Sequence, residues 1–491
     1  MSALQRVDWH AIAPLVALAG GAILVLLADL FVPARRRART AALLASAAVV
    51  AAIGFEVSIW STPRRTFCLT GSTCSYVVDR YAVTMSLVIL VCALAVVWQG
   101  LLAVRRDRIP AGEYHHLLLA ATAGAVALGS TRDLLTLIVA LETLAVPSFV
   151  LVGLRRDDAR GSEGAMIYFL FSVLGTAVTL YGVSLIYGVT GSLDYSRIAA
   201  GLAAPRIEGS LPQAAVVLVL TGFLVKVSAV PFHAWAPAAY DGAPLPVAAY
   251  LATVSKVGGF AGLVPLLRQA FEPEAHMWGL LIGVVSVASM VVGSLIALRQ
   301  TRVIRLLAWS SIAQAGFGLA PLAVAAWRPG TLPRAQSALI TYVAIYALTA
   351  TAAFAAIAAT RVENPSFEDL RGWIVRQRWV AITLGMSLFA LAGAPPGFSG
   401  LWAKITVMRS LLDGHTLWVA MVVAVATVLS LAYYLRLALV IFAHPTQGHA
   451  RVPPGRAAAL TGYVALIAIV VVSVVPGVIL HFADRALTLA P

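Results

Sequence analysis

The chain has 491 residues, of which 60% are hydrophobic and 11% are charged, and its mean hydropathy is +0.90. Soluble domains carry about 25% charged residues, so this composition excludes an ordinary water-soluble protein. The formal net charge of +14 does not indicate a nucleic-acid-binding protein, because the arginines are scattered over short loops, where they orient membrane helices. The three cysteines show no metal-binding spacing.

Apolar segments long enough to cross a bilayer as helices recur along the whole chain. We count about fourteen, at 10–32, 40–60, 80–104, 114–129, 132–153, 164–189, 212–237, 243–268, 275–299, 302–326, 334–360, 379–413, 416–443 and 457–482. Lipid admits only helices or closed barrels, and these continuous apolar runs lack the alternation of barrel strands. The sequence therefore predicts an all-α integral membrane protein, with residues 1–491 forming a single polytopic domain.

The placement of arginine predicts how the helices cross the membrane. Loops after odd-numbered segments hold 19 arginines and the opposite side holds 12, with the strongest cluster in PARRRART at 33–40. The positive-inside rule then predicts that both termini lie on the non-cytoplasmic side. The loop with Cys68 and Cys74 would face an oxidising space, so a disulfide between them is a hypothesis, with two free thiols as the alternative.

The seventh and twelfth segments are predicted to be broken helices. Pro231 and Pro237 follow Lys226 in the seventh, and GAPPGFSG at 393–400 precedes Lys404 in the twelfth. Proline removes a helical hydrogen bond and clashes with the preceding turn, and paired broken helices are typical of transporters built from inverted repeats. A plain proline kink is the alternative, but the lysine near each break favours a functional interpretation.

Four ionisable residues lie near the middle of predicted spans: Glu142, Lys226, Lys256 and Lys404. The three lysines are the only ones in the chain, against 32 arginines. A charge at this depth costs about 2.5 to 3.5 kcal/mol on insertion scales, so such residues are functional candidates. A buried ion pair that fixes helix packing is the alternative, but it explains two of the four residues at best.

The use of lysine rather than arginine indicates that these side chains titrate. Arginine stays protonated in proteins, whereas a buried lysine changes its protonation state readily. The sequence therefore predicts a proton relay in which Glu142 tunes Lys226, His233 and Lys256 pass the proton laterally, and Lys404 follows. The imidazole of His233 suits a shuttle; a hydrogen-bonded core histidine is the alternative at this position.

Other polar residues have simpler interpretations. Hydroxyl groups near Lys256 either hold water or bond to the preceding helical turn: Tyr250, Thr253 and Ser255. Carboxylates at segment ends are interpreted as solvated or capping groups: Asp133, Glu163 and Asp241. We find no zinc or iron–sulfur spacing, nucleophile elbow, Walker loop or dinucleotide fingerprint, so any energy must come from an ion gradient or a partner.

Four stretches resemble the antiporter-like membrane subunits of respiratory complex I, and the same pattern occurs in multisubunit cation/proton antiporters. They are LETL at 141–144, LVKVSAVPFHAWAP at 224–237, YDGAPLPVAAYLATVSKVGG at 240–259 and IRLLAWSSIAQAGF at 304–317. The similarity covers nearly the whole chain. It is strongest to the subunit N type of NADH-quinone oxidoreductase, because of Lys404, the LAYYLRL stretch at 431–437 and an end at fourteen segments.

The resemblance implies a proton-translocating membrane subunit of NADH-quinone oxidoreductase, coupled to quinone reduction in neighbouring subunits and without redox chemistry of its own. Glu142 and Lys226 would form the tuning pair, Lys256 the central relay and Lys404 the terminal one. FMN, iron–sulfur clusters and quinone are expected in partner subunits only. The expected surroundings are the bacterial cell membrane, its lipid bilayer and the antiporter-like and small complex I membrane subunits, with protons as cargo and no nucleic acid.

The resemblance also implies two inverted antiporter-like halves, 114–268 and 275–443, with flanking helices at 10–104 and 457–482. The sequence departs from the family at three positions: Ile304 replaces a lysine, Gln314 a histidine and Ala238 an aspartate. Because a glutamine holds water but does not titrate near neutrality, a tenth-segment contribution to the proton path is in doubt. The alternatives are a subunit of a cation/proton antiporter, a complex I subunit of the M or L type, or a structural scaffold.

Overall fold

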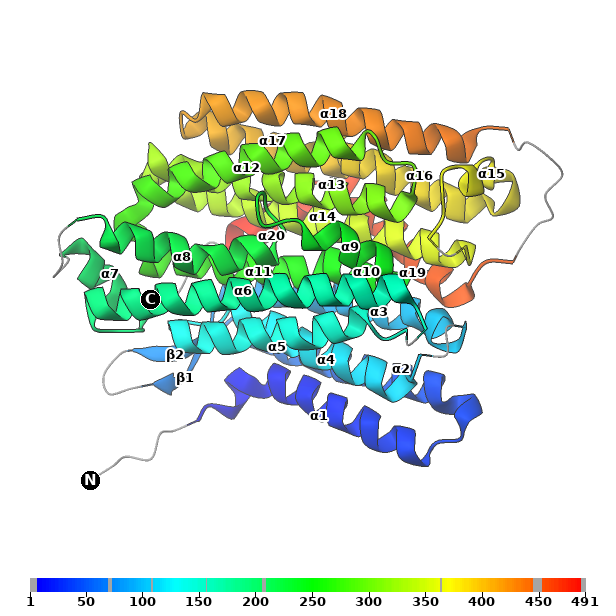
Figure 1. Ribbon diagram of the computed structural model, residues 1–491, viewed down its shortest axis with the longest axis horizontal. Helices are drawn as coiled ribbons and strands as arrows, with labels where there is room; N and C mark the ends of the chain where they lie inside the picture. The colour runs from blue at the N-terminus through cyan, green and yellow to red at the C-terminus, as the bar shows by residue number, and fades with distance from the viewer. Residues whose placement is uncertain are drawn as a thin grey trace.

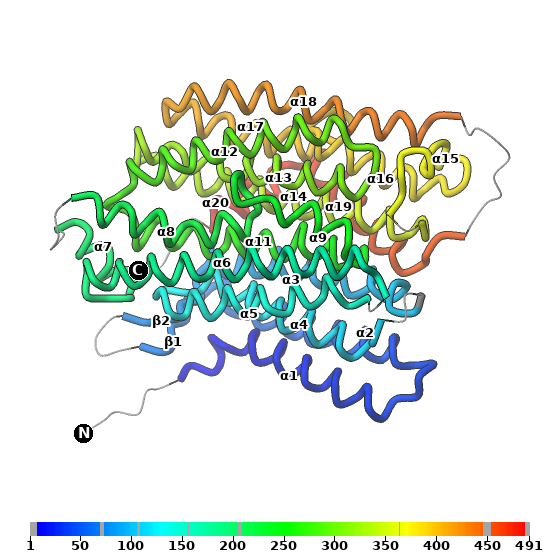
Figure 2. Tube along the Cα trace, viewed as in Figure 1, coloured from blue at the N-terminus to red at the C-terminus, as the bar shows by residue number. Residues whose placement is uncertain are grey.

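The computed structural model describes residues 7–68, 73–106, 109–155, 157–204, 209–362, 364–444 and 453–486, without the side chain of Arg106. Its helices run side by side in one bundle, from α1 (Trp9–Phe31) at one edge to α18 (Leu417–Phe442) at the other (Figures 1 and 2). The predicted all-α fold is confirmed. Five arginines of the orientation count lie outside the described residues: Arg6, Arg108, Arg156, Arg206 and Arg451.

The helices of the N-terminal part are α2 (Ala34–Ile59), α3 (Arg80–Arg106), α4 (Ala111–Leu128), α5 (Leu134–Val152), α6 (Ala159–Thr190), α7 (Tyr195–Ala203), α8 (Leu211–Lys226) and α9 (Trp235–Gly242). The following helices are α10 (Leu245–Tyr250), η1 (Leu251–Ser255), α11 (Lys256–Pro265), η2 (Leu266–Ala270), η3 (Glu272–Glu274), α12 (Ala275–Ala297), α13 (Val303–Leu319), η4 (Ala320–Ala326) and η5 (Pro329–Thr331). The C-terminal part contains α14 (Leu332–Thr360), η6 (Glu368–Leu370), α15 (Trp373–Arg376), α16 (Arg378–Ala392), α17 (Phe398–Asp413), α19 (Arg456–Val474) and α20 (Gly477–Arg485).

Within the described residues, 11 helices are long and apolar enough to cross a membrane, and α8 and α16 are shorter apolar helices. The predicted total of about fourteen spans and the two inverted repeats stay predictions. The broken seventh and twelfth helices also stay predictions, although the chain has a non-helical connection in each of the two regions. α8 ends at Lys226 and α9 begins at Trp235, while α16 ends at Ala392 and α17 begins at Phe398.

A small hairpin closes one end of the bundle. Strands β1 (Arg64–Cys68) and β2 (Cys74–Val78) pair antiparallel, and Cys68 and Cys74 form a disulfide, which confirms that hypothesis. The start of α1 lies at the same end, because Asp8 forms an ion pair with Arg64 at 3.1 Å. The C-terminal α20 lies there too, since the ring of Phe482 stacks on Trp60 at the end of α2, with centroids 5.1 Å apart.

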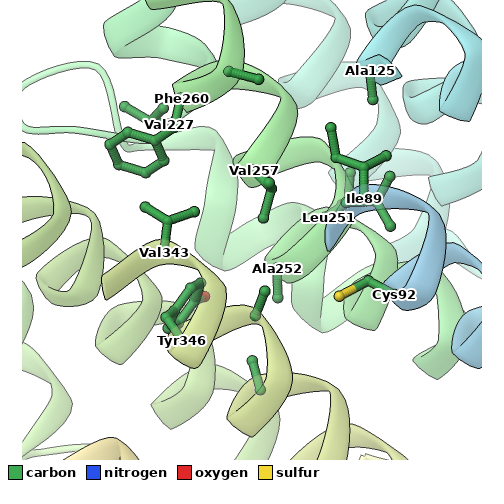
Figure 3. Close-up of a cluster of buried hydrophobic side chains, with 14 of the residues drawn as sticks. Ile89, Cys92, Ala125, Val227, Leu251, Ala252, Val257, Phe260, Val343 and Tyr346 are labelled. Carbon is green, nitrogen blue, oxygen red and sulfur yellow. The ribbon is translucent and has the colours of Figure 1, made fainter. Parts of the chain in front are cut away.

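The centre of the bundle is one continuous helix made of α10, η1, α11 and η2. Every residue from 246 to 267 is buried. Figure 3 shows Leu251 and Ala252 of this helix between Cys92 of α3 and Tyr346 of α14. Two stretches of the helix, η1 and η2, are π-helical, and the first ends immediately before Lys256. Such widened turns occur frequently at functional sites; the sequence analysis did not predict them.

Candidate proton-relay site

Glu142 and Lys226 face one small cavity between α5, α6 and α8. The cavity measures about 30 Å³, which is enough for a water molecule. The carboxylate accepts a hydrogen bond from the hydroxyl of Thr176 on α6, and Lys226 Nζ donates to Tyr168 Oη at 3.2 Å. Among the described residues the two groups form no direct ion pair. The structure therefore brings the predicted tuning pair together across a water-sized space.

The end of α8 fixes the position of Lys226. Lys226 is the last residue of the helix, and Ser228 takes a left-handed backbone conformation with φ of 56°. Carbonyls at a helix C-terminus lack intrahelical partners and create a negative end that favours a cation. Trp235 satisfies one of them by donating from Nε1 to Val225 O at 2.9 Å. The indole ring of Trp235 stacks on the ring of Tyr168, with centroids 4.1 Å apart. This stacking orients the phenol whose hydroxyl accepts the hydrogen bond from Lys226.

Lys256 is bound by a single serine on the neighbouring helix α13. Its Nζ donates to both the backbone oxygen and the hydroxyl of Ser311, each at 2.6 Å. The same hydroxyl lies 2.8 Å from Tyr346 Oη on α14 and 3.4 Å from Tyr240 Oη on α9. Lys256 is only 2% exposed. Ser311 is therefore a junction that joins the central amine to two phenols.

Lys404 is bound at the break between α16 and α17. Its Nζ donates to Ala392 O at 2.7 Å and to Ser430 Oγ at 2.9 Å. Ala392 is the last residue of α16, so the amine satisfies a carbonyl that the helix end leaves without a partner. The amine also lies 4.7 Å from the centroid of the Phe317 ring, a favourable cation–π arrangement.

Hydroxyl and amide groups lie between Lys256 and Lys404, but among the described residues no hydrogen bond joins the groups around Lys256 to those around Lys404. Tyr346, which contacts Ser311, lines a cavity of about 10 Å³ together with Gln314 and Lys404. Gln314 Nε2 donates to Leu391 O at 3.1 Å and to a tyrosine hydroxyl on α18 at 3.3 Å. Its Oε1 accepts from the phenol of Tyr342. The glutamine that replaces a family histidine is thus hydrogen-bonded at both ends of its amide.

Between Lys226 and Lys256 the described side chains leave one gap. Tyr168 binds Lys226, and Tyr240 binds Ser311. The indole ring of Trp235 lies between these two phenols. Its N–H group cannot link them, because it already donates to a carbonyl. The hydroxyl of Ser255, the residue before Lys256, is buried and interacts with Tyr168, but it forms no close hydrogen bond among the described residues. A water molecule would therefore have to join Lys226 to Lys256 at this gap.

His233 lies apart from the lysines. It is half-buried, packs against Trp309 with ring centroids 5.4 Å apart, and lines a polar cavity of about 530 Å³. The charged residues of that cavity are Arg160, Glu163, Asp241, Arg302 and Arg305. Among the described residues, no hydrogen bond joins His233 to a lysine. Its role as a link between Lys226 and Lys256 stays a prediction.

A second polar cavity, of about 400 Å³, reaches Tyr240. It shares Arg160, Asp241 and Arg302 with the cavity beside His233. Asp241 pairs with Arg302 at 2.9 Å and accepts from Asn364 Nδ2 at 2.9 Å, so it is a paired group that lines both polar cavities. Together the two cavities form a polar space that extends from the arginine-rich end of the bundle to Tyr240, whose hydroxyl contacts Ser311.

The remaining sequence interpretations have mixed outcomes. Asp133 caps α5 by accepting from Thr136 N at 2.8 Å, as predicted. Thr253 bonds to Ala249 O in the preceding turn at 2.7 Å, and Tyr250 Oη lies 3.4 Å from a threonine hydroxyl on α4, so neither contacts Lys256. Glu163 lines the polar cavity beside His233.

The sequence does not reveal which hydroxyl groups bind the lysines or bind Ser311 beside Lys256. These are Tyr168, Tyr240, Ser311, Tyr346 and Ser430. A signal existed, since phenols inside apolar segments need a hydrogen-bond partner, but the sequence does not tell which of them faces a lysine. In the described part of the chain, no group of His, Cys, Asp and Glu residues is arranged to hold a metal ion.

Comparisons with known proteins give a consistent result. A family described as NADH:quinone oxidoreductase/Mrp antiporter, transmembrane, matches residues 131–430. NADH-quinone oxidoreductase subunit N of Salinispora tropica is 47% identical over 446 residues, which cover 89% of this chain and 85% of the relative. A chain of respiratory complex I from Thermus thermophilus has a TM-score of 0.79 at 30% identity, covering 95% of this chain and 98% of that one. A chain of the Mrp complex from Dietzia sp. has a TM-score of 0.85 at 22% identity, covering 98% and 97%, and so shares the fold.

Proposed function

The chain belongs to the NADH:quinone oxidoreductase/Mrp antiporter family, in the branch of NADH-quinone oxidoreductase subunit N, and we propose that it translocates protons across the membrane. The observation that carries the proposal is the line of buried amines, each bound by groups that can pass or accept a proton. A scaffold would not need three amines in apolar surroundings, because each costs stability there.

In this proposal the arginine-lined cavities admit the proton. It reaches Tyr240 from the cavity, passes through Ser311 to Lys256, and continues through Tyr346 to Lys404. Hydroxyl groups suit this role because each can donate and accept at the same time. A water bonded to the hydroxyl of Ser255 would complete the connection toward Tyr168.

Glu142 and Lys226 act as the electrostatic control of the line. A nearby carboxylate favours the charged form of an amine, so an ionised Glu142 holds the proton on Lys226. When Glu142 is neutralised or its charge is countered by a neighbouring subunit, Lys226 releases its proton toward Lys256. Because Glu142 is only partly buried, its carboxylate is accessible to such a neighbour.

The energy comes from redox chemistry in partner subunits. We propose that FMN, iron–sulfur clusters and quinone are bound there, and that this chain contacts antiporter-like and small membrane subunits of the same complex. The proposed location is the bacterial cell membrane, with both termini on the non-cytoplasmic side. Residues 114–268 and 275–443 are the proposed antiporter-like halves, related by inverted topology.

A subunit of a cation/proton antiporter is the second candidate, because the matching family includes Mrp antiporter subunits as well as NADH:quinone oxidoreductase subunits. Sequence identity favours the redox-driven enzyme. Purifying the native assembly and recording its absorbance separates the two candidates. We expect flavin and iron–sulfur absorbance in proportion to this subunit; an intact assembly without either chromophore would reject the redox-driven function and support the antiporter.

A further inference from the structure

An apolar cleft on the outer surface of the bundle contains none of the relay residues. It measures about 770 Å³ and lies between α3, α14, α19 and α20. Its walls are almost entirely hydrocarbon, with Leu87 and Val91 on α3, Leu348 on α14, and Leu460 and Val464 on α19. Val91, Leu460 and Val464 are each more than half exposed, so the described chain leaves the cleft open along its length.

The length of the cleft matches one leaflet of a bilayer. Its lining extends from Leu87 to Trp98 on α3 and from Arg456 to Ala468 on α19. At a rise of about 1.5 Å per residue these stretches are about 17 Å long, roughly half of the ~30 Å hydrocarbon core. The cleft therefore suits a chain that enters from one side of the membrane only.

The two ends of the cleft differ. Ile479 and Phe482 of α20 close the end near the hairpin, where Phe482 stacks on Trp60. At the opposite end lie Trp98 and the exposed Arg456, the first residue of α19. Arg456 has no carboxylate partner among the residues that the structure describes. Trp98 lies within α3, which continues to Arg106, whereas Arg456 is at the start of α19, where its guanidinium favours a phosphate.

We propose that this cleft binds an acyl chain of an anionic phospholipid whose phosphate contacts Arg456. A transmembrane helix of a partner subunit is about 10 Å wide and crosses the whole core, so it would have to pass α20, which closes the far end. A neutral lipid or a free fatty tail would leave Arg456 without a phosphate of matching charge. Arginine-rich loops are predicted at the open end, so the lipid comes from the cytoplasmic leaflet.

The bound chain would pack against a helix of the relay. α14 presents Ala344 and Leu348 to the cleft and Tyr346 to Ser311. Its Thr351 donates to Cys92 of α3 on the floor of the cleft. An acyl chain there fills the space behind α14 and holds Tyr346 toward Lys256. This consequence rests on the proposed function, whereas the lipid site does not.

The test uses the purified assembled complex in phosphatidylcholine vesicles with a trace of a photoreactive lipid. The probe is either phosphatidylglycerol or phosphatidylcholine with a photoreactive group in its acyl chain, and labelled peptides are mapped by mass spectrometry. We expect phosphatidylglycerol to label 87–98 and 456–468 about tenfold more than phosphatidylcholine, the factor that a charge-assisted hydrogen bond provides. Arg456→Gln should remove this difference, while Arg409→Gln, at an exposed arginine on α17, should not.

A second variant tests the cleft itself. Val464 lines the cleft and is 60% exposed, so Val464→Trp should reduce labelling by both probes while the subunit content of the complex stays normal. Equal labelling by both lipids, unaffected by Arg456→Gln, would overturn the anionic headgroup site. Protection of both peptides in the wild-type complex would show that a partner subunit covers the cleft and would also overturn the proposal. Neither result depends on proton pumping.

Discussion

Lys226 and Lys404 both lie beside a non-helical connection between two helices, but different chemistry holds the two amines. Lys226 shares a small cavity with the carboxylate of Glu142 and donates to a phenol. Lys404 donates to Ala392 O, at the end of α16, and to a serine hydroxyl. Among the described residues, no carboxylate forms an ion pair with Lys404 or with Lys256.

This difference assigns different roles to the two ends of the line. A negative charge changes the energy of a nearby ammonium far more than a neutral hydroxyl or carbonyl does. We infer that the protonation of Lys226 follows the state of Glu142, while Lys256 and Lys404 receive and pass on a proton without a fixed counter-charge. In the proposed relay, Glu142 and Lys226 control proton transfer at one end, and Lys256 and Lys404 carry the proton along the rest.

The largest decrease in proton pumping should come from removing the negative charge beside Lys226. Glu142→Gln keeps a hydrogen-bond acceptor for Thr176 but removes the negative charge, and we expect proton pumping by the reconstituted complex to fall by about tenfold or more, equivalent to at least about 1.4 kcal/mol. Glu272→Gln, at an exposed carboxylate in η3, is the control and should pump normally. Normal pumping by an assembled Glu142→Gln complex would contradict a control role.

At the other end of the line, Lys404→Arg tests whether a positive charge alone is sufficient or whether the side chain must release a proton. Arginine can still donate to Ala392 O but stays protonated, so we expect assembly without proton transfer and pumping reduced by about tenfold. Arg409→Lys, an exchange at an exposed position of the same helix, should have no effect. If Lys404→Arg pumps as the wild type does, a fixed positive charge is sufficient there and the contrast with Lys226 is lost.

A smaller effect is expected from the junction beside Lys256. Ser311→Ala removes the hydroxyl that joins Lys256 to Tyr240 and Tyr346 but leaves the backbone oxygen of residue 311. A single hydrogen bond of about 0.5 to 1.5 kcal/mol corresponds to a decrease in pumping of about two- to tenfold. Thr253→Val is the control, because that hydroxyl bonds only to its own helix. Equal pumping by the two variants would remove Ser311 from the path.

The smallest effect should come from the hydrogen bond to Glu142. Thr176→Val removes the donor but not the charge of the carboxylate. We expect a decrease in pumping of about two- to fivefold, within the range of one hydrogen bond. Thr143→Val, beside Glu142 on an exposed face of α5 and bonded to Val139 O, should leave pumping unchanged. A larger loss in Thr176→Val than in Glu142→Gln would show that orientation matters more than charge.

The four charged residues could be predicted from the sequence because depth in an apolar segment is a local property. Glu142, Lys226, Lys256 and Lys404 each lie far from the ends of their segments, and the prolines and glycines near two of them mark where the helices end. The side chains bound to the amines were not accessible in this way, because Ser311 is 55 positions from Lys256.

Neighbouring residues of one type can have different partners, which a single sequence does not distinguish. Ser310 bonds to Leu307 O in its own helix, whereas the adjacent Ser311 binds Lys256. His233 shows that residues close together in the sequence can also lie in different sites. It lies close to Lys226 in the sequence, but the non-helical connection after α8 directs it into the arginine-lined cavity.

If a proton passes through the amine of Lys256, a Lys256→Met complex should lose proton pumping, and this measurement tests the relay directly. The purified enzyme would be reconstituted in vesicles, and protons moved per NADH oxidised would be compared with the wild type at equal subunit content. Methionine fills similar space without a titratable group, so we predict fewer protons per NADH, with flavin and iron–sulfur content unchanged. A fully assembled Lys256→Met complex that moves as many protons per NADH as the wild type would contradict the relay.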